Sequence, residues 1–475
     1  MDWNTLRSKR MSISGIPALA KPPLQPLLRF ARPSEYSLGS EPYLQHAPAE
    51  ARPSCYTSQH PLFCADWTHG AAGELVALGL FREGFQNRIQ IVSGRADRDR
   101  AGDSNLGPGD SNLGPGDSNL GPGSRNASPA GRELGAPGGA GSSARGSTFD
   151  FACVAETLVD YPATALQWEP HGHERLAVSS EVLRLYKLGL DYGEPALVQT
   201  HMLANNSTAN AASGGGNGAA AHDINTFPPV TSFDWNAADP SIVITLSVDT
   251  TCTVWDLSRS HAAGSHDTAH VKTQLIAHDL EVFDVKFLHM STNVFASVSN
   301  DGSMRAFDLR SLEHSTIIYE PTGPAPPAAD SPAASAQYNP QALLRLLASC
   351  ADQHHLATVG VNLNQVLIID LRMPGVPVVT IDGLFDGQSS APINLLQWHP
   401  TANLLATGGD DCQALVWDCS GRTGHRPAAD SKVVIDTPVL AYSADYEVNT
   451  VCWRRGCDNW MGVVSGKGFQ ALETQ

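Results

Sequence analysis

The chain has 475 residues, of which 42% are hydrophobic and 17% charged, so it can bury a sizeable core. Its formal net charge of −17 argues against a surface that tracks nucleic-acid phosphates, because such binding depends on clustered Lys and Arg. The nine Cys are spread singly, without the spacing of a disulfide framework or a zinc site, and no stretch approaches the ~20 apolar residues of a membrane span. We therefore expect reduced thiols, a cytoplasmic and nuclear location, and no metal, nucleic acid or membrane partner.

The first segment, residues 1–52, is rich in Pro and Ala and lacks the apolar core of a signal peptide. Its opening contains Arg7, Lys9 and Arg10, which leaves a mitochondrial transit peptide as an alternative. We predict a disordered tail, because this composition offers little apolar surface to bury.

An extended strand is predicted at residues 53–59 (PSCYTSQ), and strands follow until a long insertion at 95–148. That insertion contains the heptad GDSNLGP three times in tandem. Gly and Pro at this density exclude a helix or a coiled coil, so we predict a disordered loop inserted into a folded domain. Two further low-complexity loops are predicted at 203–221 and 321–337.

Residues 276–320 show most clearly how the ordered part is built. Alternating residues at 282–288 and an apolar run at 294–298 predict two strands. Asp301-Gly302 then predicts a tight turn into a third strand, which ends at Phe307-Asp308. A His about twenty residues before such a turn and an aromatic-Asp pair after it are typical of one WD-repeat propeller blade.

The innermost strand of this blade recurs along the chain as a short apolar run that leads to an aromatic residue. The aromatic positions are Trp67, Trp168, Trp235, Phe287, Trp398 and Trp453, and Ala348 takes the place in a seventh copy. Third strands end in the WD-like pairs Trp255-Asp256, Phe307-Asp308, Ile369-Asp370 and Trp417-Asp418. The pattern predicts an all-β, seven-bladed WD-repeat propeller at residues 53–475.

Closure of the ring follows from edge removal. We expect the strand at 53–59 to pair beside the C-terminal strand near 468–473, so that no blade lacks its fourth strand. The last two blades are predicted at 390–419 and 438–475.

The polar residues of the repeats are predicted to be structural. In blade 4, His278, Ser297 and Asp301 occupy the places of a buried hydrogen-bonded set, although Phe307 lacks the indole N–H that would complete it. Corresponding blade-locking residues elsewhere are Asp249, Trp255, Asp411 and Trp417. The pair His354-His355 is predicted to face solvent in a turn.

No catalytic arrangement stands out against this background. The sequence lacks a phosphate-binding Gly-rich loop after a strand and a Gly-x-Ser-x-Gly elbow. We therefore expect no enzyme activity and no cofactor.

Two segments point instead to protein partners. Arg310 in FDLR (307–310) and Arg372 in IDLR (369–372) follow a third strand, where a planar guanidinium at the blade rim can reach a partner carboxylate. The alternative is that each Arg forms a local salt bridge. The next segment, SLEHSTIIYE (311–320), continues the FDLR motif.

This segment carries a close resemblance to a known family, together with HVKTQLIAHD (270–279), TSFDWN (231–236), DTTCTVWDL (249–257) and DDCQALVWD (410–418). The chain resembles the WD-repeat regulators typified by TRANSPARENT TESTA GLABRA and anthocyanin-regulating proteins of plants and by the animal DDB- and cullin-associated factor that binds DYRK kinases. The resemblance spans about 54–475, and the loop insertions suggest a fungal-type homologue. The chain departs from the pattern at Ala348, at Asn362-Leu363, in its C-terminal strand and in the insertion at 95–148.

The resemblance implies a non-enzymatic, monomeric scaffold. Its expected partners are DYRK- or HIPK-type kinases or transcription regulators such as MYB and basic helix-loop-helix factors, with Arg310, Arg372, Glu313, His314 and Tyr319 as partner-binding residues. The alternative it implies is a substrate receptor of a cullin-RING ubiquitin ligase. In that reading FDLR and IDLR would contact the ligase adaptor, with Phe or Ile where the family has Trp.

Overall fold

The computed structural model describes residues 54–474 apart from 71–72, 85, 97–148, 173, 192, 206–227, 264–265, 322–340, 362, 383–390, 421–432 and 457–458. The predicted disordered tail at 1–52 lies outside the described residues, as do almost all of the insertion at 95–148 and of the loops at 203–221 and 321–337. Strand β4 extends to Ala96, so it includes the first two residues of the predicted insertion.

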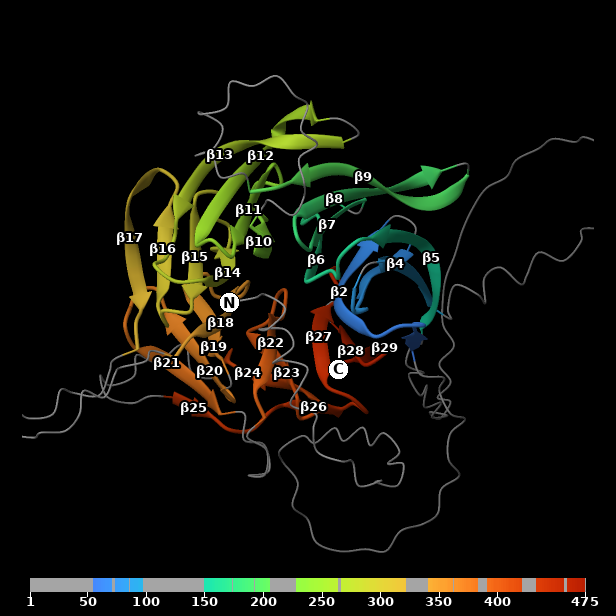
Figure 1. Cartoon of the computed structure of the whole chain (residues 1–475). Helices are drawn as coiled ribbons and strands as arrows, with labels where there is room; N and C mark the ends of the chain where they lie inside the picture. The colour runs from blue at the N-terminus through green and yellow to red at the C-terminus, as the bar shows by residue number, and fades with distance from the viewer. Residues whose placement is uncertain are drawn as a thin grey trace, which may run out of the picture.

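Seven radial blades of antiparallel strands surround a central axis, which confirms the predicted fold class (Figure 1). Blade 1 contains β2 (Leu62–Gly70), β3 (Gly73–Leu80), β4 (Asn87–Ala96) and β5 (Phe149–Val159). Blade 2 contains β6 (Ala165–Trp168), β7 (Arg175–Ser179), β8 (Leu183–Asp191) and β9 (Glu194–Leu203). Blade 3 contains β10 (Val230–Trp235), β11 (Ile242–Ser247), β12 (Thr251–Ala263) and β13 (His266–Ile276). Blade 4 contains β14 (Val282–Phe287), β15 (Val294–Ser299), β16 (Met304–Asp308) and β17 (Ser311–Tyr319).

The remaining blades use the C-terminal third of the chain. Blade 5 contains β18 (Leu343–Ala348), β19 (His355–Gly360), β20 (Gln365–Asp370) and β21 (Pro377–Asp382). Blade 6 contains β22 (Ile393–Trp398), β23 (Leu404–Gly409), β24 (Gln413–Asp418) and β26 (Leu440–Ser443). Blade 7 contains β27 (Val448–Trp453), β28 (Trp460–Ser465), β29 (Gly468–Glu473) and the N-terminal β1 (Cys55–Thr57). Among the described residues no helix is long and apolar enough to cross a membrane.

The core lies between the blades, because each sheet must bury both of its faces. The six aromatic residues predicted at the ends of the innermost strands are buried at between 0% and 6% exposure. Each belongs to an apolar cluster, and most of these clusters join two neighbouring blades. Ala348, which replaces the aromatic in blade 5, is only partly buried and packs against the cluster formed with blade 4.

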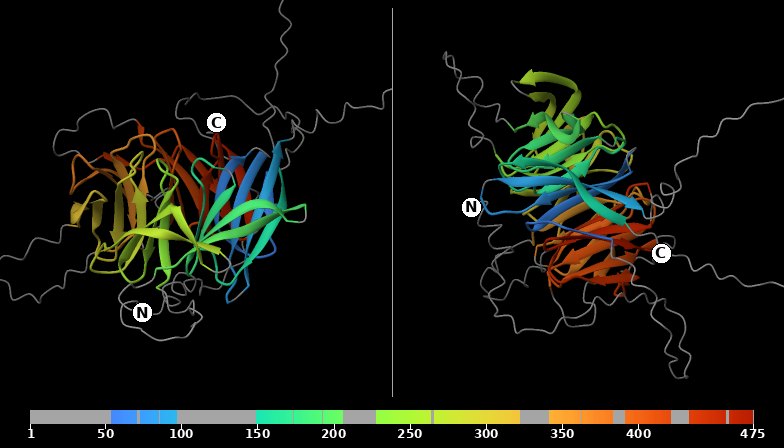
Figure 2. Two further views of the ribbon diagram at one scale, coloured as in Figure 1. Left: turned by 90° about the horizontal axis from the view of Figure 1, so that it is seen from above. Right: turned by 90° about the vertical axis from the view of Figure 1, so that its right-hand side faces the viewer.

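The ring is closed by its first strand. β1 pairs antiparallel with β29, with Tyr56 opposite Phe469, which confirms the predicted closure. Tyr56 packs against the apolar cluster that joins blades 7 and 1, and the backbone N–H of Ala471 donates to the Ser54 carbonyl at 2.8 Å. Seen from its side, the ring is a disc, with the strands running across its thickness (Figure 2).

Two features depart from seven separate four-stranded blades. Blades 2 and 3 form one eight-stranded sheet, because Asp267 of β13 pairs in parallel with His201 of β9. Blade 5 carries a fifth strand, β25 (Val433–Ile435), which pairs in parallel with β21.

The predicted boundary of blade 7 at residue 438 is wrong. Residues Leu440–Ser443 form β26, the fourth strand of blade 6, and blade 7 begins at β27. Between β24 and β26 the chain leaves blade 6 to form β25 on blade 5. The sequence did not indicate this detour, because three residues of strand pattern within a polar segment give no periodicity to read.

Candidate functional site

The polar residues of blade 4 form a buried set around His278. Its Nδ1 lies 3.0 Å from Asp301 Oδ2, and its Nε2 lies 2.8 Å from Ser297 Oγ. A carboxylate only accepts hydrogen bonds, so Nδ1–H donates to Asp301 and Ser297 donates to Nε2. Phe307 does not take part and instead stacks on Phe295, with ring centroids 5.1 Å apart.

Blades 3 and 6 contain the contact that blade 4 lacks, the hydrogen bond from a Trp indole to a hydroxyl. Trp255 Nε1–H donates to Thr245 Oγ1 at 2.9 Å, and Trp417 Nε1–H donates to Thr407 Oγ1 at 3.0 Å. Their turn residues, Asp249 and Asp411, accept hydrogen bonds from backbone N–H groups two residues further on. The indole in blades 3 and 6 and the imidazole in blade 4 therefore bind a hydroxyl at the same position, the fourth residue of the blade's second strand.

The carboxyl groups of Asp301 and Asp411 have opposite electrostatics. Burial works to raise the pKa of Asp301, but hydrogen bonds from His278 and Ser303 outweigh it and lower that pKa. Burial raises the pKa of Asp411, and the backbone N–H of Gln413 offsets this only in part. Asp411 also lines a cavity of about 10 Å³ at the turn of blade 6.

We expect Asp301→Asn to lower the free energy of unfolding at pH 7 by about 1–3 kcal/mol, the range for a lost hydrogen bond to a charged group. The stabilisation from Asp301 is fully present above the unfolded pKa of ~3.9 and is lost as pH falls through the lower folded pKa, so the deficit should shrink in acid. The matched variant Asp411→Asn removes a carboxylate whose charged form the fold disfavours. It should leave stability within about 0.5 kcal/mol of wild type at pH 7, or raise it. Urea unfolding between pH 3 and pH 7 checks both, and equal losses in the two variants would contradict the assignment.

Arg310 and Arg372 occupy equivalent turns of neighbouring blades. Arg310 forms a two-point contact with Asp308, with Nε–Oδ1 at 2.9 Å and Nη2–Oδ2 at 2.6 Å. Arg372 makes the same contact with Asp370, at 2.9 and 2.6 Å. The Arg310 hydrogen bonds lower the pKa of Asp308 to about 2. The local salt bridge considered as an alternative is therefore formed at both positions.

These two Arg remain available at the surface, with side chains 70% and 56% exposed. Both lie between the third and fourth strands of their blades, so they emerge on the same face of the ring. In blades 3 and 6 the corresponding aspartates instead accept from a serine hydroxyl, with Ser258 on Asp256 and Ser420 on Asp418. Blades 4 and 5 thus each carry an exposed guanidinium two residues after this Asp, where blades 3 and 6 have a serine.

The other three predicted partner-binding residues lie on β17, the outermost strand of blade 4. His314 is exposed and Tyr319 is partly buried, while the side chain of Glu313 lies outside the described residues. Ile317 and Leu312 on the same strand are 50% and 38% exposed. We call Arg310, Arg372 and β17 the blade 4–5 rim, and its role in partner binding stays a prediction.

A ring of polar contacts that the sequence did not reveal joins consecutive innermost strands. Acceptor oxygens on one blade receive a backbone N–H from the next blade, from Asp66 to Trp168, Gln167 to Trp235, Asp234 to Phe287 and Asp284 to Leu346, at 2.7 to 3.1 Å. Burial raises the pKa of Asp66 and Asp234, and the charges of Arg455 and Lys286 respectively offset part of this rise. The sequence signal that could have indicated these contacts is a polar residue one or three positions before the aromatic residue of the innermost strand.

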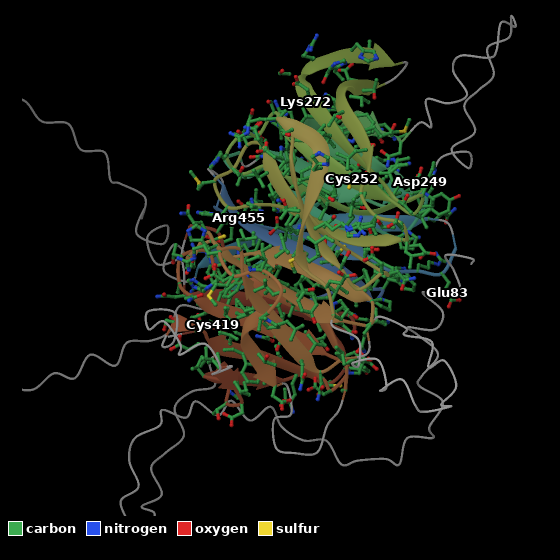
Figure 3. All side chains as sticks on the ribbon, turned by 90° about the vertical axis from the view of Figure 1, so that its left-hand side faces the viewer. Glu83, Asp249, Cys252, Lys272, Cys419 and Arg455 are labelled. Atoms are coloured by element: carbon green, nitrogen blue, oxygen red, sulfur yellow. The ribbon has the colours of Figure 1, made fainter. Side chains whose placement is uncertain are left out.

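The junction of blades 7 and 1 is the most highly charged of these contacts. Arg454 donates to both Glu74 oxygens, at 2.7 and 2.5 Å, and Trp67 Nε1–H also donates to Glu74, at 2.9 Å. Arg455 donates to Asp66 at 2.8 Å and to the Trp168 carbonyl at 3.0 Å. Figure 3 shows Arg455 on one face of the ring and the turn residues Asp249 and Glu83 on the opposite face.

The predicted exposure of His355 is wrong. This residue begins β19 and is 4% exposed, with Nδ1 3.5 Å from Asp352 and Nε2 3.8 Å from Asp370. Burial lowers its pKa, although both carboxylates oppose the shift. Among the described residues no group of His, Cys, Asp and Glu side chains is arranged to hold a metal ion.

The radial blades, the Asp-containing turns and the Trp–Thr contacts define a WD-repeat β-propeller. Comparison with known proteins agrees, since residues 378–418 match the WD domain, G-beta repeat family. A WD repeat-containing protein of Saccharomyces cerevisiae is 32% identical over 87% of this chain and 75% of its own length. An uncharacterised WD repeat-containing protein of Schizosaccharomyces pombe is 34% identical over 67% of this chain and 76% of its own length.

A third relative has a more specific name. The DDB1- and CUL4-associated factor 7 homolog of Dictyostelium discoideum is 34% identical over 66% of this chain and 80% of its own length. The chain belongs to the WD-repeat protein family, and this membership supports a general role as a scaffold or adaptor in protein–protein interaction.

Proposed function

We propose that the chain is a non-enzymatic scaffold that docks protein partners, namely DYRK- or HIPK-type kinases or transcription regulators. The observation that carries the proposal is the closed propeller, sealed by β1 on β29 and held by inter-blade contacts from Asp66, Gln167, Asp234 and Asp284 and at the Arg454–Glu74 junction. A surface that is already rigid loses little conformational freedom when a partner binds, so the binding free energy is not reduced by a cost of ordering the scaffold.

The motifs at 270–279 and 311–320, which carry the family resemblance, support the choice of partner class. We place this scaffold in the cytoplasm and nucleus and take its core to be monomeric. The eight cysteines that the structure describes are free thiols, which supports a reducing compartment.

We expect the purified full-length chain, immobilised on beads, to retain a purified DYRK-type kinase at low ionic strength. The exposed side chains of β17 on the blade 4–5 rim, among them Leu312, His314 and Ile317, supply the contact area. An unrelated seven-bladed propeller of similar net charge serves as the control, because it separates specific docking from electrostatic capture. Equal retention on both columns, or none on either, would refute the kinase proposal.

A second candidate is a substrate receptor of a cullin-RING ubiquitin ligase. It is favoured by the two exposed guanidinium groups of Arg310 and Arg372 and by the name of the Dictyostelium relative, which refers to DDB1 and CUL4. A guanidinium can exchange its local carboxylate for one on a partner, because its fork geometry matches either.

For this candidate, Arg310→Ala combined with Arg372→Ala is expected to weaken binding to purified DDB1 at least ~10-fold, which corresponds to the loss of ~1.4 kcal/mol. Kinase binding should be unchanged. The matched control is Ser258→Ala combined with Ser420→Ala, which removes the side-chain donor to the equivalent Asp in blades 3 and 6. Biolayer interferometry measures both, and DDB1 affinity that survives the double Arg variant would remove this candidate.

A further inference from the structure

The outer edge of blade 5 is covered by a segment from elsewhere in the chain. Blade 5 already has its four strands in β18 to β21, and β25 is an additional one. Val433, Val434 and Ile435 pair in parallel with Val379, Thr380 and Ile381. An exposed outer strand offers unpaired N–H and C=O groups, so it is a template for any extended chain that reaches it.

Side chains add a selective element to this backbone pairing. Val433 and Ile435 pack against the apolar cluster between blades 5 and 6, which includes Val379 and Ile381. Val434 points the other way and is 51% exposed. The edge therefore reads apolar β-branched residues at two positions separated by one residue, because alternate side chains of a strand face the same way.

The contact is short, and the strand pairing of blade 6 does not depend on it. β25 covers only the central residues of β21, which extends from Pro377 to Asp382. Parallel pairing is less stable per residue than antiparallel pairing. The next strand, β26, has its own register on β24, and the Val439 N–H donates to the Val416 carbonyl at 2.7 Å, so blade 6 stays complete when β25 leaves.

We propose that the outer edge of β21 is a docking site for an extended peptide of a partner protein, and that residues 433–435 occupy this edge until such a peptide displaces them. The peptide carries β-branched apolar residues two apart and lies parallel to β21. A longer peptide gains over β25 by pairing beyond the three residues that β25 covers. This inference rests on the proposed scaffold function and gives it one defined surface.

The test uses full-length variants and a fluorescein-labelled peptide of residues 430–437 (DSKVVIDT) as the probe. In the opened variant, Val433→Asp and Ile435→Asp prevent β25 from packing. In the matched control, Val434→Asp changes the exposed residue of the same strand. A short tether holds β25 at an effective concentration on the order of mM, so we expect the opened variant to bind the probe at least about tenfold more tightly than wild type or the Val434→Asp control.

A second probe with Val433→Asp and Ile435→Asp should not bind any of the proteins, whereas a probe with Val434→Asp should bind the opened variant like the parent peptide. Failure of the parent probe to bind the opened variant overturns the proposal. Dimerisation of the opened variant in analytical ultracentrifugation without probe binding also overturns it, because the edge then takes a second copy of the chain.

Hydrogen exchange of the wild-type protein gives an independent readout if the opened variant does not fold. The amides of 433–435 should exchange through local opening, at least ~100-fold faster than those of β19, because low-stability segments open without global unfolding. Equal protection would make β25 a fixed part of the fold and overturn the proposal. Retention of the kinase is measured separately, so a failure of peptide docking at β21 can be distinguished from a failure of the scaffold function.

Discussion

Arg454→Ala is expected to lower the free energy of unfolding by about 3–5 kcal/mol, the range for removing one partner of a buried ion pair. The Arg454 and Glu74 side chains are only 14% and 5% exposed, and they join the last blade to the first. Alanine would deprive the buried Glu74 carboxylate of its guanidinium, while Trp67 Nε1–H would still donate to it. It would also remove the guanidinium that lies 5.8 Å from the Phe149 ring centroid.

Urea unfolding followed by tryptophan fluorescence measures this loss. The matched control is Arg310→Ala, which removes an exposed ion pair of similar geometry and should leave the urea midpoint close to that of wild type. Arg454→Met keeps most of the packing and should give a loss almost as large as alanine, because the unpaired charge dominates. Similar small losses at positions 454 and 310 would show that the junction of blades 7 and 1 does not depend on this ion pair.

Deleting residues 1–58 is expected to destabilise the ring by at least ~3 kcal/mol and to cause self-association. The deletion removes β1 and with it the Ser54 contacts to Phe149, Gln470 and Ala471, and each such hydrogen bond contributes ~0.5–1.5 kcal/mol. It also uncovers β29 as an edge strand that other copies can pair with.

Thermal unfolding combined with size-exclusion chromatography tests this expectation. Deletion of residues 1–50 is the control, because it leaves β1 and Ser54 in place, and this variant should behave like wild type. A monomeric 1–58 deletion that unfolds at the wild-type temperature would show that the ring is held without its first strand.

The fold could be predicted because each blade repeats a local pattern. Trp67, Trp235 and Trp398 all end innermost strands and are all buried, so one clear copy around residues 276–320 was enough to find the others. The position of β25 could not be predicted, because a three-residue strand is defined by the edge it meets and not by its own residues. The pairing of Asp267 with His201 across blades 2 and 3 depends in the same way on two segments that are distant in sequence.

The site was predictable in part for the same reason. The turns that hold Arg310 and Arg372 lie within a repeat, so their place at the blade rim followed from the motif. The ion pairs between Arg454 and Glu74 and between Arg455 and Asp66 join residues nearly a whole chain apart, and neither partner indicates the other. His355 was predicted to lie in a turn, but β19 already begins at this residue, which places its side chain inside the blade.

The closure of blade 7 by β1 also constrains how this protein is made. The ribosome releases β1 first, but its partner β29 follows only after six blades have been translated, on the order of tens of seconds later. Until then an unpaired strand and the open side of blade 1 are exposed to solvent. The ring can therefore close only after β29 has been made, and a stop codon at position 468, which removes β29, would leave it open.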